Sequence, residues 1–160
     1  MLNVDVGYAH RPDQLAFVAG AVEAVRRLNQ AGWRVIVVTN QAGVARGYYD
    51  EAAVHDFHSA MNQALAAQGA HIDAFYHCPF HEEASIAAYR HENHPDRKPN
   101  PGMLLRALAD VGVAPQDAFM IGDRDSDMQA AKRAGVQGYL FSGDNLDGLV
   151  RRILDERGDG

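Results

Sequence analysis

The chain has 160 residues, of which 47% are hydrophobic, enough for about one domain with a substantial buried core. Its formal net charge of -6 argues against a protein that grips nucleic-acid backbones, because that binding needs clustered lysine and arginine. The single cysteine, Cys78, excludes an intramolecular disulfide, and no apolar run is long enough to span a bilayer. We therefore expect one cytoplasmic domain over residues 1–160 that binds neither nucleic acid nor membranes.

Apolar periodicity and glycine stops predict alternating helices and strands. The first half should contain a helix ending at Gly32, a strand over 33–38, a helix from Asp50 to just before Gly69, and a strand over 72–76. After a long loop over 77–101, we expect a helix over 103–111, a strand over 118–121, a helix after Ser126, a strand over 138–141 and a helix from Leu146. This alternation predicts an α/β protein, with a Rossmann-like, doubly wound parallel sheet.

The segment from Phe119 to Asp127 is the most informative in the chain. An apolar run ends at Gly122 and is followed by three carboxylates within five residues, the first of them Asp123. Open α/β sheets bind ligands beyond the carboxyl ends of their strands, and carboxylate oxygens suit a hard cation such as Mg²⁺. The same residues would also be expected if Ser126 or Asp127 merely capped the next helix. These residues alone do not separate the two interpretations.

Two further segments carry groups that suit phosphate. Thr39 and Asn40 end an apolar strand, where a hydroxyl and an amide can bind phosphoryl oxygens, although a simple strand-ending turn is the favoured explanation of this segment alone. Arg46 follows between two glycines, and Lys98 is held extended by the proline after it. A lysine in a proline-rich loop is more often only a solubilising charge. The combination of Thr39, Lys98 and Asp123, in this order, is more specific than its parts and indicates a phosphoryl-transfer site.

Four motifs together resemble the haloacid dehalogenase (HAD) superfamily of phosphatases, subclass IIIA. The resemblance is to the subgroup that contains D-glycero-D-manno-heptose 1,7-bisphosphate phosphatase and histidinol-phosphate phosphatase. The motifs are Leu2 to Tyr8, Val38 to Gln41 with Gly43 and Ala45 to Gly47, Arg97 to Pro99 with Pro101 to Met103, and Met120 to Asp123 with Asp127 and Met128.

The resemblance implies phosphoryl transfer through an aspartyl-phosphate with Mg²⁺, in a monomer without a large cap domain. It implies that Thr39 and Lys98 are catalytic, that Asp123 binds the metal, and that Asp127 supports this loop or holds Lys98. The implied substrate-binding residues are Asp5, Gly7, Tyr8, Asn40, Gln41, Arg46, Arg97 and Arg124. The expected substrate is a small sugar bisphosphate, and the heptose 1,7-bisphosphate is favoured. Histidinol phosphate is an alternative, and a noncatalytic phosphate-binding protein is another.

The chain departs from this family at its first motif, a strand that ends in Asp-x-Asp-Gly. These residues would lie immediately before Leu2 and are absent, so the nucleophile and the general acid have no counterpart in the chain. In the family this strand is central, so we expect a truncated central strand and a natural start roughly a dozen residues upstream. A less favoured alternative is that Leu2, Val4 and Val6 insert as a makeshift strand.

A second departure concerns zinc. Many members carry a Cys-x-His and Cys-x-Cys loop before Arg-Lys-Pro, which forms a tetrahedral structural site. Here Cys78 remains, but Phe80 takes the histidine position, and His94 and Asp96 stand where the later cysteines would be. His81, His91 and His94 could still gather around Cys78. We favour a loop without zinc.

Overall fold

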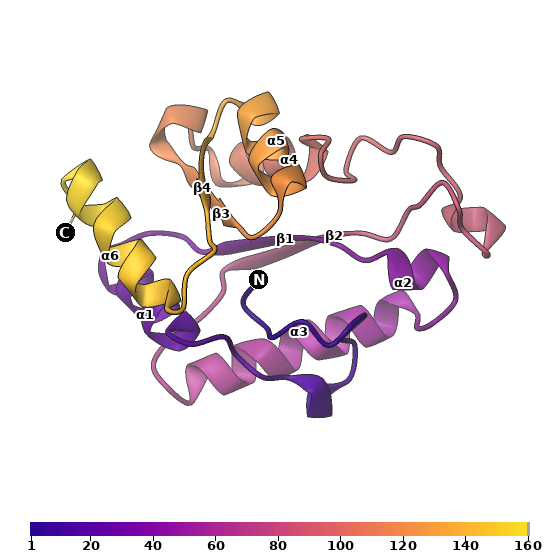
Figure 1. Ribbon diagram of the computed structural model, residues 1–160, viewed down its shortest axis with the longest axis horizontal. Helices are drawn as coiled ribbons and strands as arrows, with labels where there is room; N and C mark the ends of the chain where they lie inside the picture. The colour runs from indigo at the N-terminus through magenta and orange to yellow at the C-terminus, as the bar shows by residue number, and fades with distance from the viewer. Residues whose placement is uncertain (160) are drawn as a thin grey trace. The chain divides into compact units, whose positions relative to one another are not determined.

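The computed structural model describes residues 1–159 as an alternation of helices and strands (Figure 1). The α-helices are α1 (Ala21–Gln30), α2 (Ala42–Ala45), α3 (Glu51–Ala66), α4 (Gly102–Val111), α5 (Asp125–Ala134) and α6 (Leu146–Arg157). The strands are β1 (Ile36–Asn40), β2 (Ala74–Cys78), β3 (Phe119–Gly122) and β4 (Gln137–Leu140). Three short 3-10 turns, η1 (Pro12–Gln14), η2 (Ala87–Tyr89) and η3 (Pro115–Asp117), complete the order.

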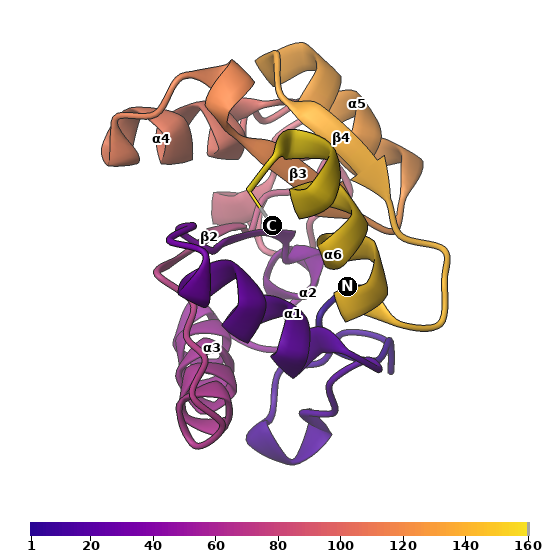
Figure 2. The ribbon, with the colours of Figure 1, turned by 90° about the vertical axis from the view of Figure 1, so that its left-hand side faces the viewer.

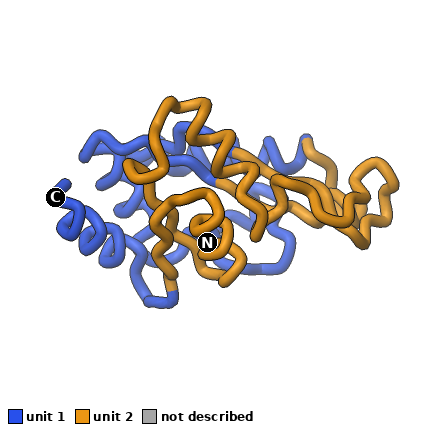
Figure 3. The backbone as a smooth tube through the Cα atoms, turned by 90° about the horizontal axis from the view of Figure 1, so that it is seen from above, with its two compact units in different colours: residues 1–37, 52–75, 142–160 blue, residues 38–51, 76–141 orange. Residues whose placement is uncertain are grey.

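The described residues form two compact units, which are coloured separately in Figure 3. Unit 1 consists of residues 1–37, 52–75 and 142–160, and unit 2 consists of residues 38–51 and 76–141. None of the helices in residues 1–159 has the length and apolarity that a membrane span requires.

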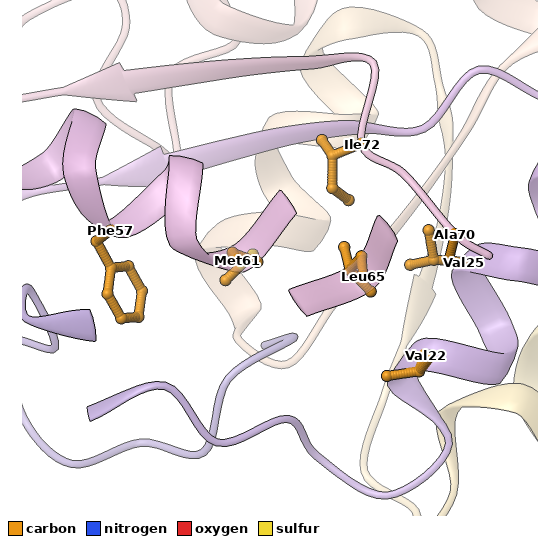
Figure 4. Close-up of a cluster of buried hydrophobic side chains, with 7 residues drawn as sticks. All are labelled: Val22, Val25, Phe57, Met61, Leu65, Ala70 and Ile72. Atoms are coloured by element: carbon orange, nitrogen blue, oxygen red, sulfur yellow. The ribbon is translucent and has the colours of Figure 1, made fainter. Parts of the chain in front are cut away.

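The core of unit 1 is built on one face of α3. Phe57, Met61 and Leu65 lie four residues apart, so their side chains share one helix face. They pack with Val22 and Val25 of α1 (Figure 4). The cluster is completed by Ala70 and Ile72.

Helices α1 and α6 run side by side in unit 1 (Figure 2). Arg27 of α1 donates two hydrogen bonds to the Asp147 carboxylate of α6, at 2.7 and 3.0 Å. Arg151 donates to the same carboxylate at 3.1 Å. A bidentate guanidinium–carboxylate pair therefore joins the two helices.

The first residues of unit 1 do not form a strand of either parallel sheet. Asn3 makes a single antiparallel bridge with Phe17, with backbone hydrogen bonds on either side of it. Val4 and Val6 are exposed. The alternative in which Leu2, Val4 and Val6 serve as a makeshift strand of the parallel sheet is therefore wrong.

In unit 2, β3 and β4 pair in parallel, with Phe119 opposite Gln137 and Gly122 opposite Leu140. Helix α5 packs on this pair. The apolar cluster of unit 2 consists of Leu104, Met120, Ala130, Ala131, Ala134 and Val136. Small alanines on α5 let the helix approach the two strands closely.

The strands form two two-stranded sheets, β1–β2 and β3–β4. The first pair is also parallel, because the Asp73 N–H donates to the Val35 carbonyl and the Gln41 N–H to the Cys78 carbonyl, so both chains advance together. The predicted α/β class with parallel strands is confirmed. Within residues 1–159, each strand has one strand neighbour.

All four strands differ in their bounds from the predictions, β3 and β4 by one residue at each end. The strand predicted over 33–38 begins at Ile36 and continues to Asn40, because the Asp73 carboxylate, and not a strand, accepts from the Val35 N–H at 2.7 Å. The strand predicted over 72–76 begins at Ala74 and extends to Cys78. His77 and Cys78 therefore belong to β2, and the loop predicted over 77–101 begins after them and contains η2.

Candidate active site

Lys98 is fixed at the carboxyl end of β1 through both its backbone and its side chain. The Asn40 amide accepts from the Lys98 N–H at 3.0 Å and donates to the Lys98 carbonyl at 3.1 Å. The Lys98 Nζ lies 2.6 Å from an oxygen of Asp127 and 3.3 Å from the Val38 carbonyl oxygen. The Lys98 side chain is only 12% exposed, so its ammonium is held in one position and is not freely solvated.

Asp127 joins the Lys98 ammonium to the start of α5. Its second oxygen accepts from the backbone N–H groups of Asp123 and Arg124, at 3.2 and 3.1 Å. A side chain at Gly122 would clash, since its Cβ would lie 2.3 Å from the Cβ of Asp127. Asp127 therefore both caps the helix and binds Lys98, so the two interpretations of this acidic segment are compatible.

Asp123 is the first residue after β3, and its side chain is exposed. No group among residues 1–159 hydrogen-bonds to its carboxylate. A partner-free carboxylate at a strand end suits Mg²⁺, which often binds through one or two carboxylates and completes its shell with water and phosphate oxygens. No group of three His, Cys, Asp or Glu side chains that could hold a metal occurs within the described part of the chain. Asp123 can therefore supply one ligand of a magnesium ion, and the described residues do not form a complete set of protein ligands around it.

Thr39 is the penultimate residue of β1, and the Nε2 of Gln41 donates to its hydroxyl oxygen at 3.1 Å. The Thr39 hydroxyl donates to the Asn40 carbonyl at 3.3 Å. Gln41 in turn accepts from the Tyr49 hydroxyl at 2.6 Å. Sequence reasoning missed Tyr49, because only its position after the Ala45 to Gly47 motif distinguishes it from any other tyrosine.

Arg46 and Arg97 also belong to unit 2. The Arg46 Nη2 lies 3.6 Å from Glu83, and its Nε is buried without a hydrogen-bond partner. Arg97 donates a long hydrogen bond, 3.4 Å, to the Phe80 carbonyl. Burial lowers the pKa of His81, and the charges of Arg97 and Arg46 lower it further, while those of Glu83 and Glu82 oppose this shift.

The predicted substrate residues Asp5, Gly7 and Tyr8 lie in unit 1. The Asp5 carboxylate accepts from the Gly7 N–H at 2.9 Å, which closes a short turn. Gly7 and Tyr8 have φ angles of 66° and 52°, and the second is unusual for a residue with a side chain. Arg124, the other predicted substrate contact, is the exposed N-cap residue of α5.

Among the described residues, Cys78 and His94 do not gather with a third His, Cys, Asp or Glu into a group that could hold a metal. The Cys78 thiol is buried, and burial raises its pKa, which opposes the thiolate that zinc needs. The His94 ring stacks on Phe80 with its centroid 4.1 Å away, and its Nδ1 is 4.0 Å from the Cys78 sulfur. Asp96 is paired with Arg106 at 2.9 Å. His94 and Asp96 thus contact an aromatic ring and a guanidinium, and a loop without zinc stays a prediction.

Comparisons with known proteins find relatives that align over most of the chain. A HAD-hydrolase-like family model matches residues 96–148, which include Lys98, Asp123 and Asp127. A D-glycero-beta-D-manno-heptose-1,7-bisphosphate 7-phosphatase of Rhodopseudomonas palustris is 40% identical over 156 residues, which cover 98% of this chain and 86% of the relative. The Haemophilus influenzae enzyme of the same name is 38% identical, over 96% of this chain and 86% of the relative.

Solved structures give the same result. The D,D-heptose 1,7-bisphosphate phosphatase of B. bronchiseptica, complexed with magnesium and phosphate, has a TM-score of 0.80 and 30% identity, covering 97% of this chain and 93% of that one. A HAD-like phosphatase from Mesorhizobium loti has a TM-score of 0.84 and 37% identity, covering 89% and 68%.

Proposed function

Since the chain belongs to the D-glycero-beta-D-manno-heptose-1,7-bisphosphate 7-phosphatase family of HAD-like hydrolases, we propose that it takes part in Mg²⁺-dependent hydrolysis of D-glycero-D-manno-heptose 1,7-bisphosphate. The observation that carries the proposal is the buried ion pair between Lys98 and Asp127, 2.6 Å apart, with the Thr39 hydroxyl and the partner-free Asp123 carboxylate in the same unit. Both relatives and a solved homologue act on this class of sugar phosphate.

Each group has a role that phosphoryl transfer requires. The Lys98 ammonium neutralises charge on the transferring phosphoryl group, and Asp127 keeps that ammonium in place. The Thr39 hydroxyl donates to a phosphoryl oxygen in exchange for its long bond to Asn40. Arg46 and Arg97 bind the distal phosphate, for which a planar guanidinium fork is well suited.

Mg²⁺ fits this site through Asp123, whose carboxylate is exposed beside the N-terminus of α5. When bound, the ion supplies charge neutralisation between the protein carboxylates and the phosphate oxygens. Asp5, Gly7, Tyr8, Asn40, Gln41 and Arg124 are proposed substrate contacts of the sugar and its phosphates.

The proposal includes an aspartyl-phosphate whose nucleophile is not among these residues. No Asp-x-Asp-Gly segment occurs in the 160 residues. The Asp127 carboxylate already accepts hydrogen bonds from Lys98 and from the backbone at the start of α5. We also propose that the protein acts as a monomer in the cytoplasm, which agrees with its single, buried, free cysteine.

The test compares two chains: residues 1–160 as they stand, and the same residues preceded by an apolar strand that ends in Asp-x-Asp-Gly, the first motif of the family. We expect phosphate release from heptose 1,7-bisphosphate with Mg²⁺ from the extended chain only. Equal turnover by the shorter chain would show that its nucleophile is already present. No turnover by either chain would refute the phosphatase proposal.

Two other functions are distinguished by the same experiment. Faster turnover of histidinol phosphate than of heptose bisphosphate by the extended chain would change the substrate and keep the chemistry. The second alternative is a noncatalytic phosphate-binding protein. It predicts that heptose bisphosphate binds to the extended chain with ordinary affinity and is not hydrolysed.

A further inference from the structure

We propose that Tyr49 is a positioning residue that acts through Gln41 to set the direction in which the Thr39 hydroxyl donates its hydrogen bond. The inference deepens the proposed function, on which it rests, and concerns a residue to which the resemblance gives no role. It depends on three side chains within residues 38–51 of unit 2.

The three groups form a relay of hydrogen bonds with one direction. The Tyr49 hydroxyl donates to Gln41 Oε1 at 2.6 Å, and Gln41 Nε2 donates to Thr39 Oγ1 at 3.1 Å. A carboxamide has its oxygen and nitrogen on opposite sides, so a donor on the oxygen side fixes which side presents the N–H groups. Tyr49 therefore determines that Gln41 meets Thr39 as a donor.

This direction leaves the Thr39 proton available. The incoming bond from Gln41 occupies a lone pair of Oγ1, so the hydroxyl hydrogen must turn towards another acceptor. In the absence of substrate that acceptor is the Asn40 carbonyl, at 3.3 Å, which is longer than the ordinary O–H···O distance of about 2.8 Å. A phosphoryl oxygen, a stronger charged acceptor, would replace this weak bond readily.

Gly43 supplies an independent sign that the position of the Tyr49 ring is specified. A Cβ at residue 43 would lie 2.2 Å from Cε1 and 2.6 Å from the hydroxyl oxygen of Tyr49, so only glycine lets the ring lie here. Gly43 is buried within α2, which follows Gln41 directly. The short helix thus provides the surface against which the tyrosine is held.

The first test uses the Gln41 side-chain amide and needs no substrate. Its two proton signals in a ¹⁵N–¹H spectrum, identified by their loss in Gln41→Glu, should be well separated and protected from solvent exchange. Tyr49→Phe keeps the ring but removes the donor, and we expect exchange to accelerate about tenfold, as for the loss of one hydrogen bond. Gly43→Ala, which displaces the ring, should have the same effect. Tyr48→Phe, at the exposed neighbouring tyrosine, is the matched control and should change nothing.

Unchanged Gln41 signals in both Tyr49→Phe and Gly43→Ala would overturn the relay, whatever the protein hydrolyses. The second test measures turnover in the extended chain described above. We expect Tyr49→Phe to lower kcat about tenfold, with KM changed less than about twofold, since the relay acts on developing charge. In a Thr39→Val background, Tyr49→Phe should have no further effect.

Additive losses in the double variant would show that Tyr49 does not act through Thr39 and would also overturn the proposal. The two tests separate its failure from that of the proposed function. If no chain hydrolyses a sugar phosphate, the phosphatase assignment fails, and the amide spectrum still decides whether Tyr49 orients Gln41.

Discussion

The Asp127 carboxylate accepts three hydrogen bonds, one from Lys98 and two from the backbone at the start of α5. Its partner Lys98 has no comparable second anchor, because its other contact is a 3.3 Å bond to a neutral carbonyl. Both side chains are nearly buried. The two ends of this ion pair should therefore respond differently to removal, although both lie in the proposed catalytic site.

We predict that Asp127→Ala lowers the free energy of unfolding by about 3 kcal/mol or more, because it leaves a buried ammonium without a counter-charge. Lys98→Met should cost less, about 1 to 2 kcal/mol, since Asp127 keeps its two backbone donors. Urea denaturation of both variants measures the difference. Equal losses, or a larger loss for Lys98→Met, would contradict this account of the pair.

Asn40 leads to a second prediction at the same scale. Its amide makes both a donated and an accepted bond to the Lys98 backbone, so it holds the lysine loop against the end of β1. Asn40→Ala should destabilise the fold by about 1 to 3 kcal/mol, the sum of two net hydrogen bonds. Thr39→Val serves as the control, and we expect it to lower the free energy of unfolding in urea by less. A stability of Asn40→Ala equal to that of the wild type would show that the loop is held by other contacts.

The sequence predicted Asn40 as a substrate contact. The hydrogen bonds of its amide to the Lys98 backbone could not be predicted from the sequence. The two residues are 58 positions apart, and no local pattern shows that an amide will meet a distant backbone. The sequence indicated Thr39, Lys98 and Asp123 as candidate site residues because each follows or precedes an element boundary that apolar periodicity predicts.

Among the elements, helices were predicted more closely than strands. The three-to-four-residue spacing of apolar side chains and the glycine after α4 locate helix ends. Strand ends depend on the partner, and Asp73, 38 residues away, takes the Val35 N–H and so delays the start of β1. Strand register of this kind is a long-range property that short apolar runs do not encode.

We predict that the loop after Cys78 keeps its structure without a bound metal. Because Phe80 stacks on His94 and Asp96 pairs with Arg106, we expect protein purified without added metal to contain far less than one zinc per chain. A chelator should leave its thermal unfolding unchanged. Phe80→Ala, which removes the stacking partner, should lower the unfolding temperature, and Phe119→Ala on β3 is a control for losing an aromatic ring elsewhere in unit 2. Stoichiometric zinc would overturn this prediction.

The ion pair between Arg27 of α1 and Asp147 of α6 should make the free energy of unfolding depend on pH. The hydrogen bond from Arg27 holds the pKa of Asp147 below its ordinary value, and the bond from Arg151 contributes as well. The unfolded carboxyl, with a pKa of about 3.9, therefore takes up a proton before the folded one does. The stabilisation is present above that pH and is lost as pH falls through the lower folded pKa.

Asp147→Asn should therefore be less stable than the wild type at neutral pH, and the difference should shrink as pH is lowered below about 4. Urea denaturation at pH 7, 5, 4 and 3 measures it. Asp144→Asn, in the loop before α6, is the matched control and should show no such convergence. A difference between Asp147→Asn and wild type that stays constant down to pH 3 would show that the charge of Asp147 does not stabilise the helix pair.

For the molecule as a whole, the four motifs fall in two units. Those that carry Thr39, Lys98 and Asp123 belong to unit 2, and that of Asp5 to Tyr8 belongs to unit 1. A single domain over residues 1–160 remains a prediction from length. Each strand of residues 1–159 has a strand neighbour on one side, and two-stranded sheets alone are marginally stable.

These open strand edges give a prediction that is independent of catalysis. Alternate residues of a parallel strand direct their N–H groups to opposite edges, so about half of the amides of β1 and β3 should exchange rapidly in residues 1–160. When the chain is preceded by a strand ending in Asp-x-Asp-Gly, we expect the fast amides of β3 and of the Val38–Asn40 end of β1 to slow at least about 100-fold. Hydrogen exchange followed by NMR measures each amide separately.

The identity of the strands that become protected decides where the added segment binds. The Lys98 ammonium contacts the Val38 carbonyl on β1. If only the free edges of β2 or β4 became protected, the added segment would bind away from Lys98. The assignment of the Asp-x-Asp-Gly motif to this site would then fail. An extension in which the first aspartate is replaced by asparagine should restore the protection of β1 and β3 without restoring turnover. That result would separate the role of the strand in completing the sheet from the role of its carboxylate in accepting the phosphoryl group.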